Sequence, residues 1–345
     1  MFAQGSFILG PEVERFEAEF GEYLQVKHVI GVNSGTDALF LALKAHGIGT
    51  HDEVITVANT AVPTVSAIRM TGATPVFVDV FEDSQTIDVS LIERAINCRT
   101  RAILPVHLFG YPACMKEILK TAKKHRLIVV EDACQAHGAI YEQKRAGSIG
   151  DAGCFSFYPT KNLGAFGDAG AVVTNNKRIA DKIRALRNYG EVKKFETRRD
   201  GVNTRMDEVQ AALLRWGLKH LDEWNRKRAE IANRYLQRLS NSPLKLPLSS
   251  GSITKRVWHL FVVNTDRRNA LQRYLFDRGI QTMIHYPTPI HKQRPYRLLP
   301  STPPDLPVTT RLAKRIVSLP LHPDLTWGQI SDICTSICDF YGTRS

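Results

Sequence analysis

The sequence predicts an α/β protein whose mainly parallel central sheet is flanked by helices and followed by a smaller C-terminal α+β domain. Short apolar runs alternate with helix-forming segments over the first half of the chain, and this alternation is typical of parallel strands joined by helical crossovers. The proline- and serine-rich stretch 242–251 interrupts the pattern. We therefore expect a large domain at residues 1–240 and a small domain at residues 241–345.

The composition is that of an ordinary globular protein with a basic surface. Its 345 residues, 43% of them hydrophobic, are enough for two cores, and the formal net charge is +12. This charge favours anionic partners such as nucleic acid, a membrane surface or a phosphorylated small molecule, although solvated faces also explain the dispersed basic residues. The six cysteines have no CxxC spacing, so neither a metal site nor a disulfide framework is expected. Without an evident leader or membrane-length apolar run, we expect a cytoplasmic protein.

The first expected element is an amphipathic helix at residues 11–24. Val13, Phe16, Phe20 and Leu24 fall on one face of it, and a proline occupies its first position. This helix has one apolar face to bury against the rest of the chain.

A strand expected at 28–33 leads through Ser34-Gly35-Thr36-Asp37 into a helix-forming run at 38–45. Such a turn offers free backbone N–H groups, a hydroxyl and the positive end of a helix dipole, which together suit a phosphate. A plain N-cap by Ser, Thr or Asp explains the same residues. The motif alone leaves both interpretations open.

The remaining elements follow from apolar runs and helical periodicity. Further strands of the large domain are expected at residues 54–57, 76–80, 102–106, 127–130, 153–157 and 171–173. Further helices are expected at residues 64–70, 90–97, 116–124, 177–187 and 207–239. Gly217 is a candidate for a bend in the last of these helices. The small domain is expected to contain strands at 257–264 and 281–285 and helices at 268–278 and 326–341.

Polar residues follow the apolar run 127–130 at the expected carboxyl end of a strand, where ligands gather in parallel sheets. Asp132 has the charge to face a cationic ring nitrogen, and Gln135 lies three residues further on, within reach of a neighbouring oxygen. Alternatively, Asp132 caps a helical turn. His137 is either a structural histidine or an acid or base.

Lys161 is isolated in a turn-rich loop between the expected strands 153–157 and 171–173. It is either a side chain that extends to water from a loop tip or an amine desolvated enough to lower its pKa. In the second case it can attack a carbonyl and form a Schiff base.

Together these residues offer a lysine for an aldehyde, an acid for a ring nitrogen and a helix N-terminus for a phosphate. Pyridoxal 5′-phosphate (PLP) carries all three complementary groups. We therefore expect PLP as the cofactor.

The chain resembles the DegT/DnrJ/EryC1/StrS family of sugar aminotransferases, which have the type I fold of aspartate aminotransferase. The resemblance spans nearly the whole chain and rests on the motifs FILG at 7–10, NSGTDAL at 33–39, PVFVD at 75–79, EDACQAH at 131–137, the stretch 155–170, GVNTRMDE at 201–208 and HYP at 285–287. It implies that Lys161 is the Schiff-base lysine and the base for the 1,3-proton shift. It further implies that Asp132 pairs with the pyridinium nitrogen and that Gln135 contacts the 3-oxygen of the ring.

The resemblance also implies that Gly35, Thr36 and Ser156 hold the cofactor phosphate. Asn203 would reach the phosphate of the partner subunit's cofactor, so the active unit would be a homodimer. The residues that it suggests for substrate binding are Tyr158, Tyr189, Arg205, His285 and Tyr286. Ala61 stands where many family members have an aromatic residue stacked on the ring, so His137 or an apolar side chain is expected to cover that face.

The stretch 155–165 and Arg187-Asn188-Tyr189-Gly190 look most like enzymes that aminate C3 of dTDP-3-keto-6-deoxyhexoses with L-glutamate as donor. The alternatives are the same reaction at C4, a cyclitol ketone as acceptor, or a PLP-binding regulatory protein without turnover. No helix-turn-helix or zinc module is apparent, so nucleic acid is not an expected partner. Lys193, Lys194, Arg198 and Arg199 are candidates to line the entrance for a sugar nucleotide.

Overall fold

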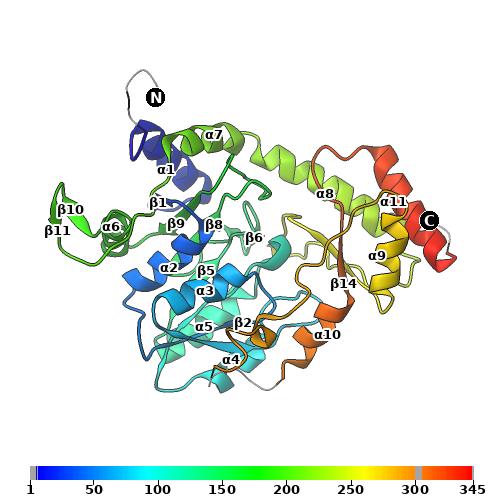
Figure 1. Cartoon of the computed structure of the whole chain (residues 1–345), viewed down its shortest axis with the longest axis horizontal. Coiled ribbons are helices and arrows are strands. Elements are labelled where there is room, and N and C mark those ends of the chain that lie inside the picture. Colours follow the sequence, from blue (N-terminus) through cyan, green and yellow to red (C-terminus); the bar gives the residue numbers. More distant parts are fainter. Residues whose placement is uncertain (1–4, 6, 300–304, 344–345) are drawn as a thin grey trace.

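A seven-stranded sheet lies at the centre of the larger part of the molecule (Figure 1), in a computed structural model that describes residues 5, 7–299 and 305–343. Its strands are β1 (His28–Val32), β2 (Glu53–Val57), β3 (Thr74–Val78), β4 (Thr100–Ile103), β5 (Ile128–Asp132), β8 (Ala152–Ser156) and β9 (Gly170–Thr174). They lie in the order β1-β9-β8-β5-β4-β2-β3. β9 is antiparallel to β1 and β8, and the other neighbours in the sheet are parallel. The expected mainly parallel sheet is confirmed, although several strands begin or end two or three residues from their predicted bounds.

The position of the Lys161 loop follows from the antiparallel pairing of β8 and β9. Strands β2, β3, β4 and β5 are separated by helices, which allow the parallel crossover, whereas residues 157–169 join β8 to β9 as a loop. This loop leaves the carboxyl end of β8 and turns back at once into the neighbouring strand. Lys161 is thereby held at the sheet edge where the parallel strands end.

Helices cover both faces of the sheet, as alternation along β9 shows. Val172 belongs to a buried cluster that includes Leu39 of α2 (Gly35–Ala45), whereas Val173 belongs to a second cluster that includes Phe16 and Phe20 of α1 (Pro11–Leu24). Successive side chains of a strand point to opposite faces, so each face has its own core. The other helices in this part are α3 (Val62–Met70), α4 (Val89–Ala95), α5 (Met115–His125) and α6 (Lys177–Leu186).

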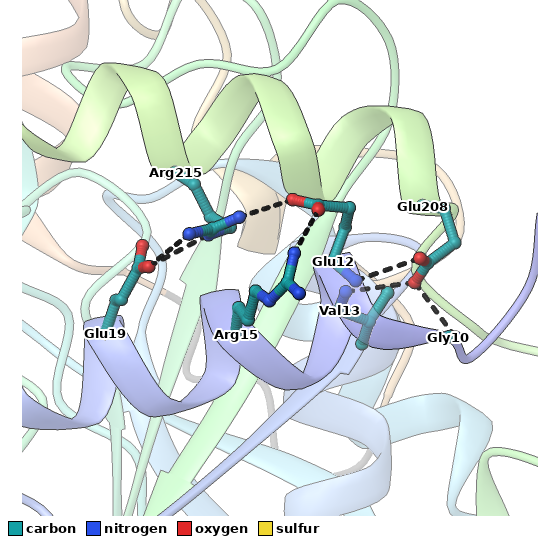
Figure 2. A network of polar contacts seen from close by, with 7 residues as sticks. All are labelled: Gly10, Glu12, Val13, Arg15, Glu19, Glu208 and Arg215. Carbon is teal, nitrogen blue, oxygen red and sulfur yellow. Dashed lines mark hydrogen bonds and ion pairs between the residues drawn. The ribbon is translucent and has the colours of Figure 1, made fainter. Parts of the chain in front are cut away.

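Helix α1 is fastened to α7 (Glu208–Leu218) by a polar network that Figure 2 shows. The N-cap of α1 is Gly10, which has no side chain to accept from the first turn. The buried carboxylate of Glu208 takes that place and accepts hydrogen bonds from the N–H groups of Gly10, Glu12 and Val13, each at 2.9 Å. A residue about two hundred positions away along the chain therefore caps this helix.

The single helix expected at 207–239 was wrong, because the chain forms α7 and then α8 (Leu221–Arg238). The interruption at residues 219–220 follows Gly217, the position expected to bend. A Cβ at Gly217 would lie 3.0 Å from Cδ1 of Leu163 in the Lys161 loop. The glycine thus lets the loop pack closely on α7, and α8 continues towards the C-terminal part of the chain (Figure 1).

The C-terminal part is built on a two-stranded antiparallel sheet of β13 (Phe261–Asn264) and β14 (Ile316–Leu319). Its helices are α9 (Arg268–Phe276), α10 (Pro307–Arg315) and α11 (Trp327–Tyr341). Tyr235 of α8 lies in the buried cluster of this part, beside Phe261 at a ring-centroid distance of 4.9 Å. The expected division into domains at residue 240 stays a prediction.

The strand expected at 281–285 was wrong. Among these residues, only Met283 forms a bridge, with Ser318 at the free edge of β14. Beyond this bridge, Tyr286 packs against the core of the larger part and accepts a hydrogen bond from Gln135. The strand expected at 257–264 is also shorter, since it begins at Phe261.

Short elements complete the chain. The expected polar segment at 188–205 contains a hairpin of β10 (Glu191–Lys193) and β11 (Glu196–Thr197). A small sheet consists of β6 (Ile140–Tyr141), β7 (Lys144–Arg145) and β12 (Thr254–Lys255), and two 3-10 turns are η2 (Leu108–Gly110) and η3 (Ile290–Lys292). In the part of the chain that the structure describes, no helix is both long enough and apolar enough to cross a bilayer.

Candidate functional site

A cavity of about 240 Å³ lies where β5 and β8 end and where α2 and α3 begin. Its lining includes Gly35, Thr36, Asp132, Gln135, Ser156, Tyr158 and Lys161. The fold therefore brings the turn after β1, the acidic end of β5 and the lysine loop together, although they are far apart in the sequence. Parallel strands that end at one edge of a sheet explain this convergence.

Lys161 contributes an amine without a partner to this cavity. Its Nζ forms no hydrogen bond or ion pair with any residue that the structure describes, and burial lowers the pKa of the ammonium group, with smaller opposing effects from Cys134 and Asp132. A buried amine of lowered pKa is more often neutral, and the neutral form is the nucleophile. Its place in a cavity wall favours the desolvated amine over a side chain that extends to water.

The loop around Lys161 is held by side chains that the sequence analysis did not identify. Asn162 donates to Asn225 Oδ1 of α8 at 2.8 Å, and its Oδ1 accepts from His259 Nδ1 at 3.1 Å. Gln210 of α7 accepts from the N–H of Phe166 at 2.9 Å. The only local signal was an asparagine next to the isolated lysine, because the partners lie far along the chain.

Asp132 is the last residue of β5, and both of its carboxylate oxygens have donors. Oδ2 accepts from the hydroxyl of Thr64 at 2.8 Å, and Oδ1 accepts from the N–H of Cys134 at 3.2 Å. The second contact is the local turn contact that the alternative interpretation described. The first is a long-range contact with α3 that the sequence did not reveal.

Gln135 connects the cavity with the C-terminal part. Its Oε1 accepts from the N–H of Phe109 at 2.8 Å, and its Nε2 donates to Tyr286 Oη at 3.1 Å. Burial raises the pKa of Tyr286 to about 12, so its phenol stays protonated at neutral pH. His285 hydrogen-bonds Ser318 Oγ through Nδ1 at 2.8 Å, and burial together with the charge of Lys161 lowers its pKa.

The N-terminus of α2 faces the same cavity. Ser34 caps the helix by accepting from the N–H of Asp37 at 3.1 Å, while the N–H groups of Gly35 and Thr36 find no acceptor among the described residues. A Cβ at Gly35 would lie 2.6 Å from the Cβ of Ser156, so only glycine allows this approach. The turn therefore has both features that the sequence left open, an N-cap and free N–H groups of the kind that bind a phosphate.

The predicted residues Tyr189, Asn203 and Arg205 do not line this cavity. Arg205 donates to Asn188 Oδ1 at 2.9 Å, and Asn203 pairs with Asn188 in an isolated bridge. They lie beside the segment that carries β10 and β11. The role of Asn203 at a partner's site and the roles of Tyr189 and Arg205 in substrate binding stay predictions.

His137 does not cover the cavity. It is fully buried, its ring lies 5.4 and 5.5 Å from the rings of Phe155 and Phe157, and neither ring nitrogen has a partner among the described residues. Burial lowers its pKa to about 3, which favours the structural interpretation over an acid or base. Ala61 itself lines the cavity at the start of α3.

Comparison with known proteins gives a consistent result. The sequence profile of the DegT/DnrJ/EryC1/StrS aminotransferase family matches residues 1–338. The dTDP-3-amino-3,4,6-trideoxy-alpha-D-glucose transaminase of Streptomyces venezuelae is 48% identical, over 93% of this chain and 85% of that protein. The dTDP-3-amino-3,6-dideoxy-alpha-D-galactopyranose transaminase of Aneurinibacillus thermoaerophilus is 45% identical, over 96% and 91%. The UDP-N-acetyl-3-dehydro-alpha-D-glucosamine 3-aminotransferase of Acidithiobacillus ferrooxidans is 43% identical, over 96% and 89%.

Solved structures confirm the fold. The structure of DesV from S. venezuelae, in complex with a ketimine intermediate, superposes with a TM-score of 0.96 at 46% identity, covering 100% of this chain and 93% of that one. The structure of NtdA from Bacillus subtilis, with the bound cofactor PMP, has a TM-score of 0.91 at 32% identity and covers 99% and 80%. The expected type I fold is therefore confirmed.

Proposed function

The chain belongs to the DegT/DnrJ/EryC1/StrS family of PLP-dependent aminotransferases, and from this premise we propose that it transfers an amino group from L-glutamate to C3 of a dTDP-linked keto-6-deoxyhexose. The observation that carries this proposal is the cavity itself. It contains an unpaired amine, a hydrogen-bonded carboxylate and free N–H groups at a helix N-terminus. These three groups complement the aldehyde, the ring nitrogen and the phosphate of PLP, so the residues present fit the cofactor.

When bound, PLP supplies an electron sink for the negative charge that develops at Cα of the amino donor. Lys161 would hold the cofactor through its aldehyde, and its amine, when free, would be the base that moves a proton at Cα of the donor. Asp132 would face the ring nitrogen and favour its protonated form. Gln135 has a second amide N–H beyond the one given to Tyr286, and we assign it to the 3-oxygen of the ring.

The phosphate is assigned to the N–H groups of Gly35 and Thr36 together with the hydroxyl of Ser156. The close approach of Ser156 to Gly35 supports this assignment, because it brings a hydroxyl beside the free N–H groups. No counter-cation from the described residues lines the cavity except Lys161. The helix dipole and hydrogen bonds therefore supply most of the attraction.

The choice of C3 rests on the three relatives described above. Their names place the amino group or the reaction at position 3, while the sugar and the nucleotide differ among them. The two dTDP-sugar transaminases are 48% and 45% identical to this chain, and the enzyme acting on a UDP sugar is 43% identical. The two dTDP-sugar transaminases are slightly more similar to this chain than the UDP-sugar enzyme, which favours dTDP as the nucleotide. The names of all three enzymes give the same carbon, C3. The net charge of +12 favours the binding of a sugar nucleotide, because its nucleoside diphosphate carries two negative charges.

We also propose a homodimer in which Asn203, Tyr189 and Arg205 serve the partner's cavity. They lie outside the cavity of their own chain, and large apolar side chains such as Phe166 and Trp216 are exposed at 83% and 61%. Phe166 is hydrogen-bonded through its N–H to Gln210 of α7, the helix that carries Trp216, so we propose that the partner subunit covers this side of the molecule.

Absorbance spectroscopy tests the reaction. We expect the PLP-loaded protein to lose its near-visible band with L-glutamate and to regain it with a dTDP-3-keto-6-deoxyhexose. A panel with the 4-keto isomer and a cyclitol ketone decides the acceptor, and recovery with the 4-keto sugar alone would overturn the choice of C3. Failure to load PLP at all would overturn the proposed function.

Mixing two inactive variants tests the dimer. If Asn203 serves the partner's site, Lys161→Ala and Asn203→Ala co-folded in equal amounts should recover about a quarter of the wild-type sites, because each heterodimer contains one intact site. No recovery, with the heterodimer demonstrated by two affinity tags, would place Asn203 in its own chain's site.

A further inference from the structure

A line of buried hydroxyl groups runs from the cavity wall to Asp132. Thr60 and Thr64 are 2% and 1% exposed, and their Oγ1 atoms lie 2.8 Å apart. Oγ1 of Thr64 lies 2.8 Å from Oδ2 of Asp132. Both threonines also line the cavity, so this line links the space for a ligand with the acid at the end of β5.

The chemistry of the three groups fixes the direction of the hydrogen bonds. An ionised carboxylate can only accept, so Thr64 donates its proton to Asp132. The hydroxyl of Thr64 then has no proton left for Thr60, so Thr60 must donate to it. Hydrogen bonds to a charged acceptor are the strong ones, and a donor chain polarises each of its members.

Thr64 is also the group best placed to decide where the oxygens of Asp132 point. Its hydrogen bond is shorter than the 3.2 Å contact from the N–H of Cys134, which lies two residues after Asp132 in the chain. Thr64 lies in the first turn of α3, where Thr and Ser side chains usually bond to their own helix or cap it. Here the hydroxyl instead leaves the helix to reach β5.

We infer that Thr64, oriented by Thr60, is a positioning residue that keeps the Asp132 carboxylate aimed at the ring nitrogen of the cofactor. This inference rests on the proposed function. Without the hydroxyl, Oδ2 of Asp132 would lose its donor inside a buried site, and the carboxylate would be free to rotate away from the ring nitrogen. The ring nitrogen would then be protonated less often, and the electron sink would weaken.

Thr64→Val, Thr64→Ser and Thr71→Val form the test set. Valine matches the shape of threonine without its hydroxyl, and serine keeps the hydroxyl. Thr71 is the matched control, because it is also buried at the other end of α3, donates to the carbonyl of Ile68 at 2.7 Å and lies outside the cavity. The measurements are the PLP dissociation constant, the ¹⁵N shift of labelled PLP at the ring nitrogen, and kcat and KM for L-glutamate.

Thr64→Val should lower kcat by roughly 10- to 100-fold, weaken PLP binding by about 10-fold and move the ¹⁵N shift towards that of the unprotonated ring, with little change in KM. Thr64→Ser and Thr71→Val should stay near wild type. Thr60→Val should move the same readouts in the same direction by a smaller factor, and it serves as the test if Thr64→Val does not fold.

Three outcomes would overturn the inference. The first is an unchanged ¹⁵N shift in Thr64→Val, or in Thr60→Val if that variant stands in for it. The second is an equal loss in Thr64→Ser and Thr64→Val, which would indicate packing rather than hydrogen bonding. The third is a wild-type protein that does not bind PLP, and this result alone would also overturn the proposed function.

Discussion

Two basic side chains of this protein, Arg215 and Lys161, have opposite surroundings and opposite properties. In the network between α1 and α7, Arg215 lies between Glu12 and Glu19, with 2.6 Å contacts to both carboxylates (Figure 2). In the cavity, Lys161 lies near one carboxylate, that of Asp132, and near the thiol of Cys134, whose pKa is raised by burial, but its Nζ pairs with neither. Hydrogen bonds to Glu19 and Glu12 raise the pKa of Arg215, whereas burial lowers the pKa of Lys161.

The comparison shows that hydrogen-bond partners determine whether a basic side chain stabilises the fold or is available for reaction. A cation that is paired on the surface contributes to the docking of a helix and is chemically inert. Desolvation without a partner destabilises the protonated form of an amine. The neutral amine is then more often present and available as a nucleophile. Substitutions in the α1–α7 network should therefore lower the free energy of unfolding, and substitutions in the cavity should lower the rate of the reaction.

The largest expected effect comes from removing the unpaired amine. Lys161→Ala should lower the rate of the glutamate half-reaction by roughly 10⁴-fold or more, because nucleophile and proton carrier are lost together. The rate is followed by the absorbance change on adding L-glutamate. The control is Lys177→Ala, which removes an exposed lysine paired with Asp181. A Lys161→Ala variant with more than a tenth of the wild-type rate would end the assignment.

Removing the counter-charge sharpens the contrast. Asp132→Asn should lower kcat by about 10³-fold, because the ring nitrogen loses its anionic partner. It should also lower the pKa of Lys161 further, since Asp132 is one of the groups that raise it. The neutral amine would then be available at lower pH, so the pH profile for PLP uptake by the cofactor-free protein should shift downwards. An upward shift would show that Asp132 does not act on Lys161.

In the network, Glu208→Ala should have the largest effect on stability. It removes the acceptor of three N–H groups at the start of α1, and the N–H of Val13 is buried. We expect a loss of about 2–3 kcal/mol, the cost of a lost cap plus unsatisfied donors. Urea unfolding measures it, and Glu14→Ala on the same helix should change stability by less than about 0.5 kcal/mol. Equal effects of the two variants would contradict the capping role.

The smallest expected effect is that of Arg215→Met, at about 1 kcal/mol, because the pair is partly exposed and screened by salt. The hydrogen bond from Arg215 lowers the pKa of Glu12. A lowered carboxyl pKa stabilises the fold above the unfolded pKa, and this contribution is lost as pH falls through the folded one. The difference between wild type and variant should therefore shrink as pH falls below about 4. A constant difference down to pH 2 would mean that packing of the arginine stem dominates.

Much of the site could be predicted from local sequence because its polar groups directly follow or lie between apolar strands. Gly35 and Thr36 begin the helix after β1, Asp132 ends β5 and Lys161 lies in the loop after β8, and these strand ends meet at one edge of the sheet. The pattern of apolar runs thus determined the fold class. The polar residues and glycines that follow these runs indicated which side chains would lie close together.

Local sequence could not decide which of two sound interpretations applied. Ser34 and Asp132 make the local contacts of a cap or turn and also lie in the cavity wall. The helical pattern at 207–239 was correct in period but did not show that the chain changes direction after Gly217. The alternating residues at 281–285 read as a strand, yet only Met283 forms a bridge there.

The sequence by itself determined the strands of the central sheet and most of the helices, and it predicted the amine, the acid and the turn that we assign to a phosphate, because each depends on residues within a few positions of one another. Only the tertiary structure decided their partners. Thr64 and Asp132 are 68 residues apart, His259 and Asn162 are 97 apart, and Glu208 and Val13 are 195 apart. No local period encodes such contacts, because they exist only once the sheet has brought distant segments to the same edge. The same assembly leaves Lys161 half-buried and unpaired in the cavity wall, while it gives Arg215 two carboxylates.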